Sequence, residues 1–383
     1  MKQNSVLLWV FMLMNFMNGL SGLMFNGILD KVSETLHISI ATTGYLTTAY
    51  SLGAALGVPV VLLVFAKAPR KPLMISMLGL TLLSILGVIF APTFPILLAF
   101  RVLMGVTGNS YGILAISTVS ALSSKERQGR SLAFLIMGNA LAMIVGVPLT
   151  RMLSAILDWK GIFGILMGLI VLAMLYFLKA LPNKPNASEK SSIKEELQYL
   201  KSSQVSLIIL FTFVMFTGYS ALYTYSTPYI VQRFPEMDPW MGFILIGIGL
   251  AAFTGNHIGG QLSDKLGFSK SMMVGAILQF IMVILLILFS GQSWLSALLM
   301  MAMVLCAWIT GLQLNLGILQ RTHYDAHFIL SLNGTGIQMG YALGSIVGSL
   351  VITTYGLSSL GFIGLVSTSL IVLIQGFALR LNK

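Results

Sequence analysis

The sequence predicts an all-α integral membrane protein of twelve transmembrane helices, built as two pseudo-symmetric six-helix halves. The first observation is composition: 57% of the residues are hydrophobic and 9% are charged, whereas a soluble domain has a charged share of about 25%. The second is a series of apolar runs of about 20 residues, the length that crosses a hydrocarbon core of about 30 Å. The third is an internal repeat at a shift of 198 residues.

The apolar runs are separated by short polar breaks from one end of the chain to the other. Backbone amides have no water partner in hydrocarbon, so the runs must form helices or a closed barrel, and they lack the alternation of barrel strands. The expected spans are Val6 to Leu29, Ala41 to Phe65, Leu73 to Ala91, Pro95 to Leu122, Ser131 to Leu153, Ile162 to Leu181, Val205 to Ile230, Trp240 to Leu262, Met272 to Phe289, Trp294 to Leu319, Phe328 to Thr353 and Leu360 to Leu379.

The internal repeat predicts how these spans divide. Leu62 to Pro69 falls on Gly260 to Gly267, and the same shift carries Gly138 onto Gly336 and Gly146 onto Gly344. One offset that aligns separated landmarks indicates tandem halves, and parallel repeats are typical of transporters. We expect an N-terminal half at 1–181, a cytoplasmic linker at 182–203 and a C-terminal half at 204–383.

The predicted linker differs from the other loops in being rich in Lys, Glu, Ser, Asn and Pro. Ser192 and Glu195 have the spacing of a capping box, which favours a short amphipathic helix on the cytoplasmic face. A solvated tether explains the composition equally well.

The net charge of +11 follows a membrane pattern rather than a nucleic-acid one. Basic residues gather in alternate loops and near the C-terminus, which predicts that this face and both termini are cytoplasmic. The single cysteine, Cys306, permits no intrachain disulfide and matches no metal-ligand spacing. We therefore expect no nucleic acid, metal or cofactor, and take as partners a small-molecule substrate, protons and the lipid bilayer. No sequence feature determines the oligomeric state, and a monomer is expected.

Charged residues inside the apolar spans carry the functional information, because each costs free energy unless it faces a cavity or a partner. Arg101 cannot shed its charge, so it should face the interior. The alternative is a structural role through buried carbonyls. Asp30, at the outer end of the first span, could titrate during transport or simply meet the headgroups. His257 has a side chain suited to proton exchange near neutrality, or is a hydrogen-bonded core histidine.

Neutral polar side chains favour neutral or amphipathic cargo. Tyr219, Tyr223 and Tyr225 in the seventh span either line a cavity that stacks on rings or form an interfacial aromatic belt. The further cavity candidates are Asn18, Asn26, Asn109, Tyr111, Asn256, Gln313, Asn315, Asn333 and Gln338.

Glycines could supply moving parts. In the fifth span Gly138, Gly146 and Pro148 leave a thin, weakly bonded helix, and the eleventh span carries glycines at four-residue intervals. Two halves could rock at these positions, although small-residue packing explains the same pattern.

Several of these motifs together resemble the major facilitator superfamily, specifically its drug:proton antiporter branch. They are Arg101 with Gly105, Gly108 and Gly112, then Gly138 through Gly146-Val147-Pro148-Leu149, then Asp158-Trp159 and Phe163. The loop Gly260-x-Leu262-x-Asp264-Lys265-x-Gly267 is similar to the cytoplasmic signature of that superfamily. Thr217-Gly218-Tyr219 to Pro228 most resembles bacterial sugar-efflux and purine-efflux exporters.

The resemblance implies a central cavity open alternately to either side, and proton-driven export of small molecules across a bacterial cytoplasmic (inner) membrane. It ties Arg101 to proton relay. The chain departs from the pattern where related exporters hold a first-helix acid, here Gly22, and where they hold a histidine, here Tyr219. Ala66 replaces the aspartate of the first-half signature loop, while Lys67, Arg70 and Lys71 remain. We expect Asp30 or His257, working with Arg101, to carry the proton.

Two alternatives from other classes remain. A proton-independent facilitator, or a sensor that binds substrate without moving it, would account for Gly22 in place of the acid. Gly108-Asn109-Ser110-Tyr111-Gly112 matches the G-x-S-x-G of serine hydrolases, but that elbow needs a strand-to-helix turn and the match lies within an apolar helix. An intramembrane hydrolase is therefore a remote alternative.

Overall fold

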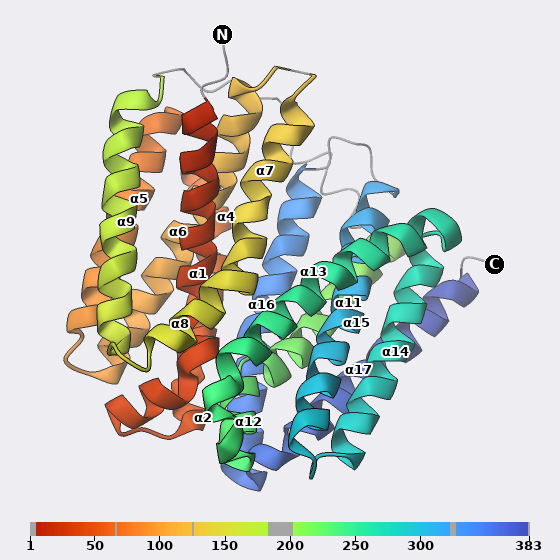
Figure 1. The fold of residues 1–383 in the computed structure, drawn as a ribbon. Helices are drawn as coiled ribbons and strands as arrows, with labels where there is room; N and C mark the ends of the chain where they lie inside the picture. The colour runs from red at the N-terminus through yellow and green to blue at the C-terminus, as the bar shows by residue number, and fades with distance from the viewer. Residues whose placement is uncertain (1–4, 66, 125, 183–201, 322–326, 382–383) are drawn as a thin grey trace. The chain divides into compact units, whose positions relative to one another are not determined.

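The computed structural model describes residues 5–65, 67–124, 126–182, 202–321 and 327–381. Within these ranges every regular element is helical, and 12 helices are long and apolar enough to cross a membrane. Their bounds lie within a few residues of most of the predicted spans, which confirms the all-α membrane fold (Figure 1). The predicted amphipathic helix at Ser192 and Glu195 lies outside the described residues.

The chain divides by its contacts into two compact units, Met1–Leu36 with Ala49–Ser188, and His37–Thr48 with Glu189–Lys383. The division differs from the sequence-based one mainly at residues 37–48, the start of the second span. These residues belong with the second unit because Ser345 donates a 2.7 Å hydrogen bond to the carbonyl of Gly44, and α2 packs against α16. Helix α3 (Tyr45–Leu52) therefore runs from one unit into the other.

The first unit is organised around its first helix. Helix α1 contacts α6, α7, α8 and α9, and lies among them in Figure 1. The helices of this unit, besides the π-helical turns η1 (Gly53–Gly57) and η2 (Ala142–Gly146), are α1 (Ser5–Leu36), α4 (Val58–Val64), α5 (Arg70–Phe90), α6 (Phe94–Leu122), α7 (Gln128–Leu141), α8 (Val147–Leu153) and α9 (Trp159–Ala180).

The second unit is built from long helix pairs, of which α11 with α16 and α14 with α15 are the most extensive. Helices α11 and α16 run parallel, because Thr212 bonds to Asn333 and Ser220 to the carbonyl of Tyr341, at the same separation in sequence. Its elements are α2 (Ile40–Thr43), α11 (Ser203–Tyr223), α12 (Ser226–Arg233), η4 (Pro235–Trp240), α13 (Met241–Leu266), α14 (Phe268–Leu288), α15 (Ser293–Leu319), α16 (His327–Tyr355), η5 (Leu357–Ser359) and α17 (Leu360–Leu381).

Two helices of the first unit are interrupted in the same way. Each π-helical turn ends in a glycine that is followed by valine and proline, as Gly57-Val58-Pro59 and as Gly146-Val147-Pro148. Proline has no N–H to donate and its ring crowds the preceding turn, so a widened turn relieves the clash. The second and fifth spans are therefore α-helical on both sides of one widened turn.

Glycine permits one close approach that the fold of this unit requires. A Cβ at Gly138 on α7 would overlap the carbonyl oxygen of Met12 on α1. The two helices pack with their backbones nearly in contact at this point, as small residues allow in membranes.

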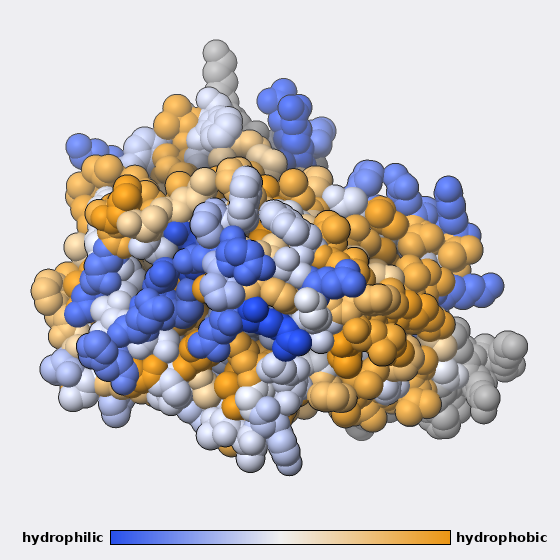
Figure 2. All heavy atoms as spheres, turned by 60° about the horizontal axis from the view of Figure 1, so that its bottom comes forward, coloured by the Kyte–Doolittle hydropathy of each residue, from blue (hydrophilic) through white to orange (hydrophobic). Residues whose placement is uncertain are grey.

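The outer surfaces suit a bilayer. Large apolar side chains are exposed along the helix flanks, among them Leu172, Leu298 and Leu373. Figure 2 shows hydrophilic residues gathered where helices end, with hydrophobic residues on the flanks. This distribution is that of a protein whose solvent is lipid along the helices and water at their ends.

Candidate functional site

Arg101 lies in the first third of α6 and is fully buried within the first unit, 0% exposed. Its Nη1 donates a 2.7 Å hydrogen bond to the carbonyl of Ser21, and Nη2 lies 3.4 Å from the carbonyl of Gly22. The guanidinium carbon lies 4.8 Å from the ring centres of both Phe25 and Tyr50. Carbonyl dipoles and two aromatic faces thus hold the charge that the sequence placed in the interior.

These contacts are of the kind expected for a structural arginine, and they include the backbone of Gly22, the position at which the sequence resemblance predicts an acid. Gly22 has no side chain, and a Cβ there would lie 2.8 Å from the ring of Tyr50, so the glycine lets this ring pack against α1. Around this point Asn109 donates to the Tyr50 hydroxyl at 3.1 Å, and Asn18 donates to the carbonyl of Gly108 at 2.8 Å. Asn18, Tyr50, Arg101 and Asn109 therefore form one polar layer between α1, α3 and α6.

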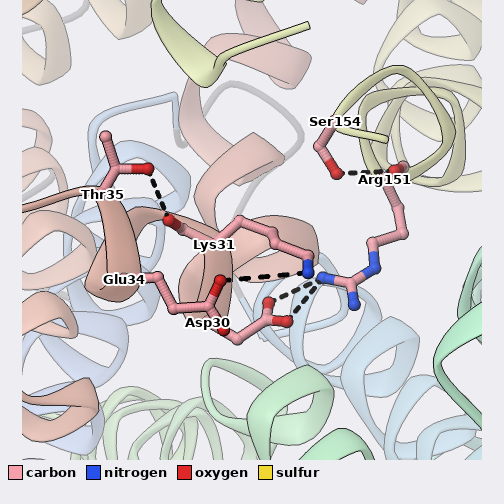
Figure 3. A network of polar contacts seen from close by, with 6 residues as sticks. All are labelled: Asp30, Lys31, Glu34, Thr35, Arg151 and Ser154. Carbon is pink, nitrogen blue, oxygen red and sulfur yellow. Dashed lines mark hydrogen bonds and ion pairs between the residues drawn. The ribbon is translucent and has the colours of Figure 1, made fainter. Parts of the chain in front are cut away.

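Asp30 is paired with Arg151, not with Arg101. Both oxygens of the Asp30 carboxylate accept from Arg151 Nη1, at 2.7 and 2.8 Å, and each residue is 5% exposed (Figure 3). The pair joins the C-terminal part of α1 to α8, across 121 positions of sequence. Two opposite charges held this deeply compensate each other, whereas either charge alone would be strongly unfavourable.

Arg151 is the functional candidate that the sequence analysis missed. It lies inside the predicted span from Ser131 to Leu153, so the signal that singled out Arg101 was equally present. Its direction comes from the π-helical turn, because one extra residue in a turn rotates everything after it by roughly 100° relative to an uninterrupted helix. The widened turn at Ala142–Gly146 therefore sets which face of α8 carries Arg151.

A polar pocket borders this ion pair at the same end of the first unit. Lys31, Glu34, Thr35, Ser154 and Asp158 contribute to its lining. Ser154 donates to the carbonyl of Arg151 at 2.7 Å, and Lys31 lies 4.0 Å from Glu34 (Figure 3). Of these lining residues, Lys31 follows Asp30 directly in sequence and Ser154 lies one helical turn after Arg151.

Aromatic side chains gather in the second unit. Tyr219 stacks on Tyr223 with ring centres 5.3 Å apart, and meets Trp308 and Tyr341 edge to face. Trp308 Nε1 donates to the Tyr219 hydroxyl at 3.3 Å. Tyr219 and Tyr223 are buried, whereas Trp308 and Tyr341 are half-buried. The accessible surface of the cluster therefore belongs to Trp308 and Tyr341. Burial disfavours the alternative of an interfacial aromatic belt.

Tyr225 is separate from this cluster. It is fully buried, and its hydroxyl donates to the carbonyl of Ser345 at 2.8 Å. The side chain of the same Ser345 donates to the carbonyl of Gly44. The third tyrosine of the predicted set therefore fastens α16 at the point where α2 attaches, rather than joining the ring cluster.

The neutral polar candidates differ in burial and in hydrogen-bond partners. In the second unit Thr212 donates to Asn333, which in turn donates to Asn315 at 3.0 Å, and Asn315 is exposed. Gln313 is buried and donates to the carbonyl of Gly259 at 2.8 Å. Asn256 and Gln338 are half-buried, as Asn18 and Asn109 are in the first unit, whereas Asn26 and Tyr111 are buried there.

His257 is exposed on α13, with a ring nitrogen 3.1 Å from the side-chain nitrogen of Gln261. It is therefore not the buried core histidine that the sequence left open. Its hydrogen-bonded neighbour lies one turn away on the same helix, so no contact described for it links it to Arg101.

The signature loops lie at helix ends. Arg70 donates to the carbonyl of Ser117 at 3.1 Å and Lys71 to that of Leu181 at 2.7 Å, while Lys67 is exposed. At the corresponding place in the second unit, Gly260 is half-buried, Asp264 and Lys265 are exposed near the end of α13, and Gly267 turns the chain with φ of +77°. This left-handed conformation favours glycine.

Ser110, the serine of the G-x-S-x-G match, is buried in the middle of α6 and does not lie on a strand-to-helix turn. No group of three or more potential metal ligands is found among the described residues.

The sequence signature of the Major Facilitator Superfamily matches residues 11–323. The chain belongs to this superfamily. A related superfamily member, the uncharacterized MFS-type transporter YbcL of Bacillus subtilis, is 28% identical over 364 residues, covering 94% of this chain and 92% of the relative. A probable sugar efflux transporter of Helicobacter pylori is 28% identical over 361 residues, covering 91% and 90%.

Solved structures of transporters share the fold at low identity. A bacterial homolog of the human lysosomal transporter Spinster, in an inward-facing and unoccupied conformation, matches with a TM-score of 0.75 at 14% identity, over 98% of this chain and 95% of that one. The nucleoside transporter NupG matches with a TM-score of 0.76 at 12% identity, over 98% and 100%. The protein is thus a multi-pass membrane transporter of the superfamily.

Proposed function

We propose that this transporter exports small neutral or amphipathic molecules in exchange for protons by alternating access. The cargo would be a sugar, a nucleobase or nucleoside, or a drug, and the site of action the cytoplasmic membrane of a bacterium, with both termini inside. The relatives named as probable sugar efflux transporters support export, and the loop charges support the orientation.

The observation that carries the proposal is the buried pair of Asp30 and Arg151. While Asp30 is ionised, the two charges cancel. Protonation of Asp30 would leave the Arg151 charge uncompensated in a buried place, which is strongly unfavourable unless the arginine moves or gains water. Proton binding would therefore favour a different packing around α8, and a ligand that binds two packings unequally shifts the equilibrium between them.

The resemblance predicts a first-helix acid at position 22, where this chain has glycine. In this proposal Asp30, eight positions further along the same helix, takes its place. Arg101 holds α1 at Ser21 and Gly22, and so positions the helix that carries Asp30. The aromatic cluster around Tyr219 is the proposed cargo site, because ring faces bind planar bases and the apolar faces of sugars without requiring charge.

A proton-independent facilitator is the second candidate, favoured by Gly22 itself. The test is transport by purified protein in liposomes under an imposed pH gradient, with pentoses, purines, nucleosides and chloramphenicol-like drugs as cargo. Wild-type protein should move protons only when cargo is present. Asp30→Asn should still exchange cargo across the membrane but no longer respond to the gradient.

Glu34→Gln is the matched control, since Glu34 lies one turn beyond Asp30 with its side chain 72% exposed. It should keep the wild-type response. Cargo movement without proton flux in the wild-type protein would establish the facilitator instead.

A further inference from the structure

A second pocket lies within the second unit, where α11 and α14 begin and α15 ends. One part of its wall is polar and includes Gln204, Ser269 and Arg321. The other part is apolar and includes the partly exposed Leu207 and Ile374, together with the buried Phe211 and Met272. A cationic rim beside an apolar wall at a helix end is unrelated to the cargo and proton groups described above, so it requires its own explanation.

Arg321 is held in place on this rim. Its Nε donates to the side-chain oxygen of Gln204 at 2.7 Å, and its guanidinium lies over the ring of Phe268 at 4.6 Å. Nη1 only reaches the carbonyl of Gly317, at 3.4 Å. Across the part of the chain that the structure describes, no carboxylate lies within ion-pair distance of this arginine.

Such an arginine still has donors to offer. The guanidinium carries five N–H groups in a planar fork that matches the oxygens of a phosphate, and it remains charged. Burial lowers the pKa of Arg321, which reports that the cation is partly desolvated. An anion placed against the guanidinium would compensate Arg321 for the hydration that burial has removed.

We propose that this pocket binds an anionic phospholipid, with the lipid phosphate on Arg321 and an acyl chain along Leu207 and Ile374, the partly exposed part of the apolar wall. Charge complementarity supports this occupant, since Lys265 and Lys270 are exposed at the same end of the unit and attract anionic headgroups. The apolar wall distinguishes a lipid from free phosphate, which would gain nothing from it. The site lies at the end predicted to be cytoplasmic and acts independently of transport.

The test is native mass spectrometry of the full-length protein released from detergent micelles with equal amounts of phosphatidylglycerol and phosphatidylcholine. Wild-type protein should retain phosphatidylglycerol preferentially. Arg321→Gln should reduce that preference about fivefold, the effect of one basic contact to a lipid headgroup. Arg233→Gln is the matched control, because Arg233 is an exposed arginine at the opposite end of the same unit that donates to Ser290 and Ser358.

A second variant keeps the arginine and fills the apolar wall. Ile374→Trp should also lower phosphatidylglycerol retention, because Ile374 is a partly exposed residue of that wall, and it decides the question if Arg321→Gln does not fold. Unchanged retention in the folded variants would overturn the proposal. If inorganic phosphate alone displaces the lipid and Ile374→Trp has no effect, the site is a free-phosphate site and the assignment to a lipid is wrong.

Discussion

Arg151→Gln should destabilise the protein strongly, because it leaves the Asp30 carboxylate buried without its counter-charge. The two hydrogen bonds of 2.7 and 2.8 Å and the exposure of 4% and 6% for the two side chains place the pair among buried ion pairs. Removing one member of such a pair costs about 3–5 kcal/mol. The double variant Asp30→Asn with Arg151→Gln removes both charges and should recover more than half of this loss.

The assay is unfolding in mixed micelles, followed by tryptophan fluorescence, for wild-type protein, both single variants and the double variant. Lys31→Gln is the control. Lys31 pairs with Glu34 at 4.0 Å with side chains 37% and 72% exposed, and exposed pairs at this spacing contribute about 0.3–0.5 kcal/mol. If Arg151→Gln costs no more than Lys31→Gln, or if the single-variant losses simply add in the double variant, the ion pair does not stabilise α1 against α8.

Three further predictions address the other groups. Arg101→Lys keeps the charge but loses the planar fork over Phe25 and Tyr50, so it should lower the unfolding free energy by about 1–3 kcal/mol and slow transport more than tenfold; wild-type rates would contradict a positioning role. Tyr219→Phe should weaken cargo binding less than about tenfold, and Tyr219→Ala considerably more, as measured by calorimetry; equal effects would mean that the ring is not the binding element. Gly138→Ala should reduce the yield of folded protein, because the added methyl meets the carbonyl of Met12. Gly164→Ala has open space at its Cβ and should fold like wild type. Size-exclusion chromatography of the two variants measures the difference.

Hydropathy and the repeat predicted the fold because membrane spans are set by length and apolarity, which are local properties. The unit assigned to residues 37–48 could not be read in this way, since it depends on Ser345 reaching Gly44 across 301 positions. The burial of Arg101 in the protein interior was predictable from the cost of a charge in lipid. The carbonyls of Ser21 and Gly22 that face its guanidinium were not predictable.

The candidate site was only partly accessible to sequence reasoning. Asp30 was singled out, but its partner Arg151 lies in another helix and is turned toward it by a π-helical turn that hydropathy does not register. Similarly, Tyr219, Tyr223 and Tyr225 share one segment of sequence, yet the break between α11 and α12 sends Tyr225 to a different set of contacts. Which residues share a face is decided by helix winding, which tertiary packing determines.

Substrate-induced proton release tests the central claim most directly. Purified protein in weakly buffered detergent solution would be mixed with a transported cargo while a pH-sensitive dye reports protons. Proton coupling through the buried pair predicts release of up to about one proton per wild-type molecule, dependent on pH, and none from Asp30→Asn despite retained cargo binding. Equal release from wild type and Asp30→Asn would contradict the assignment of Asp30, and cargo binding without any release from wild type over the whole pH range would contradict proton exchange itself.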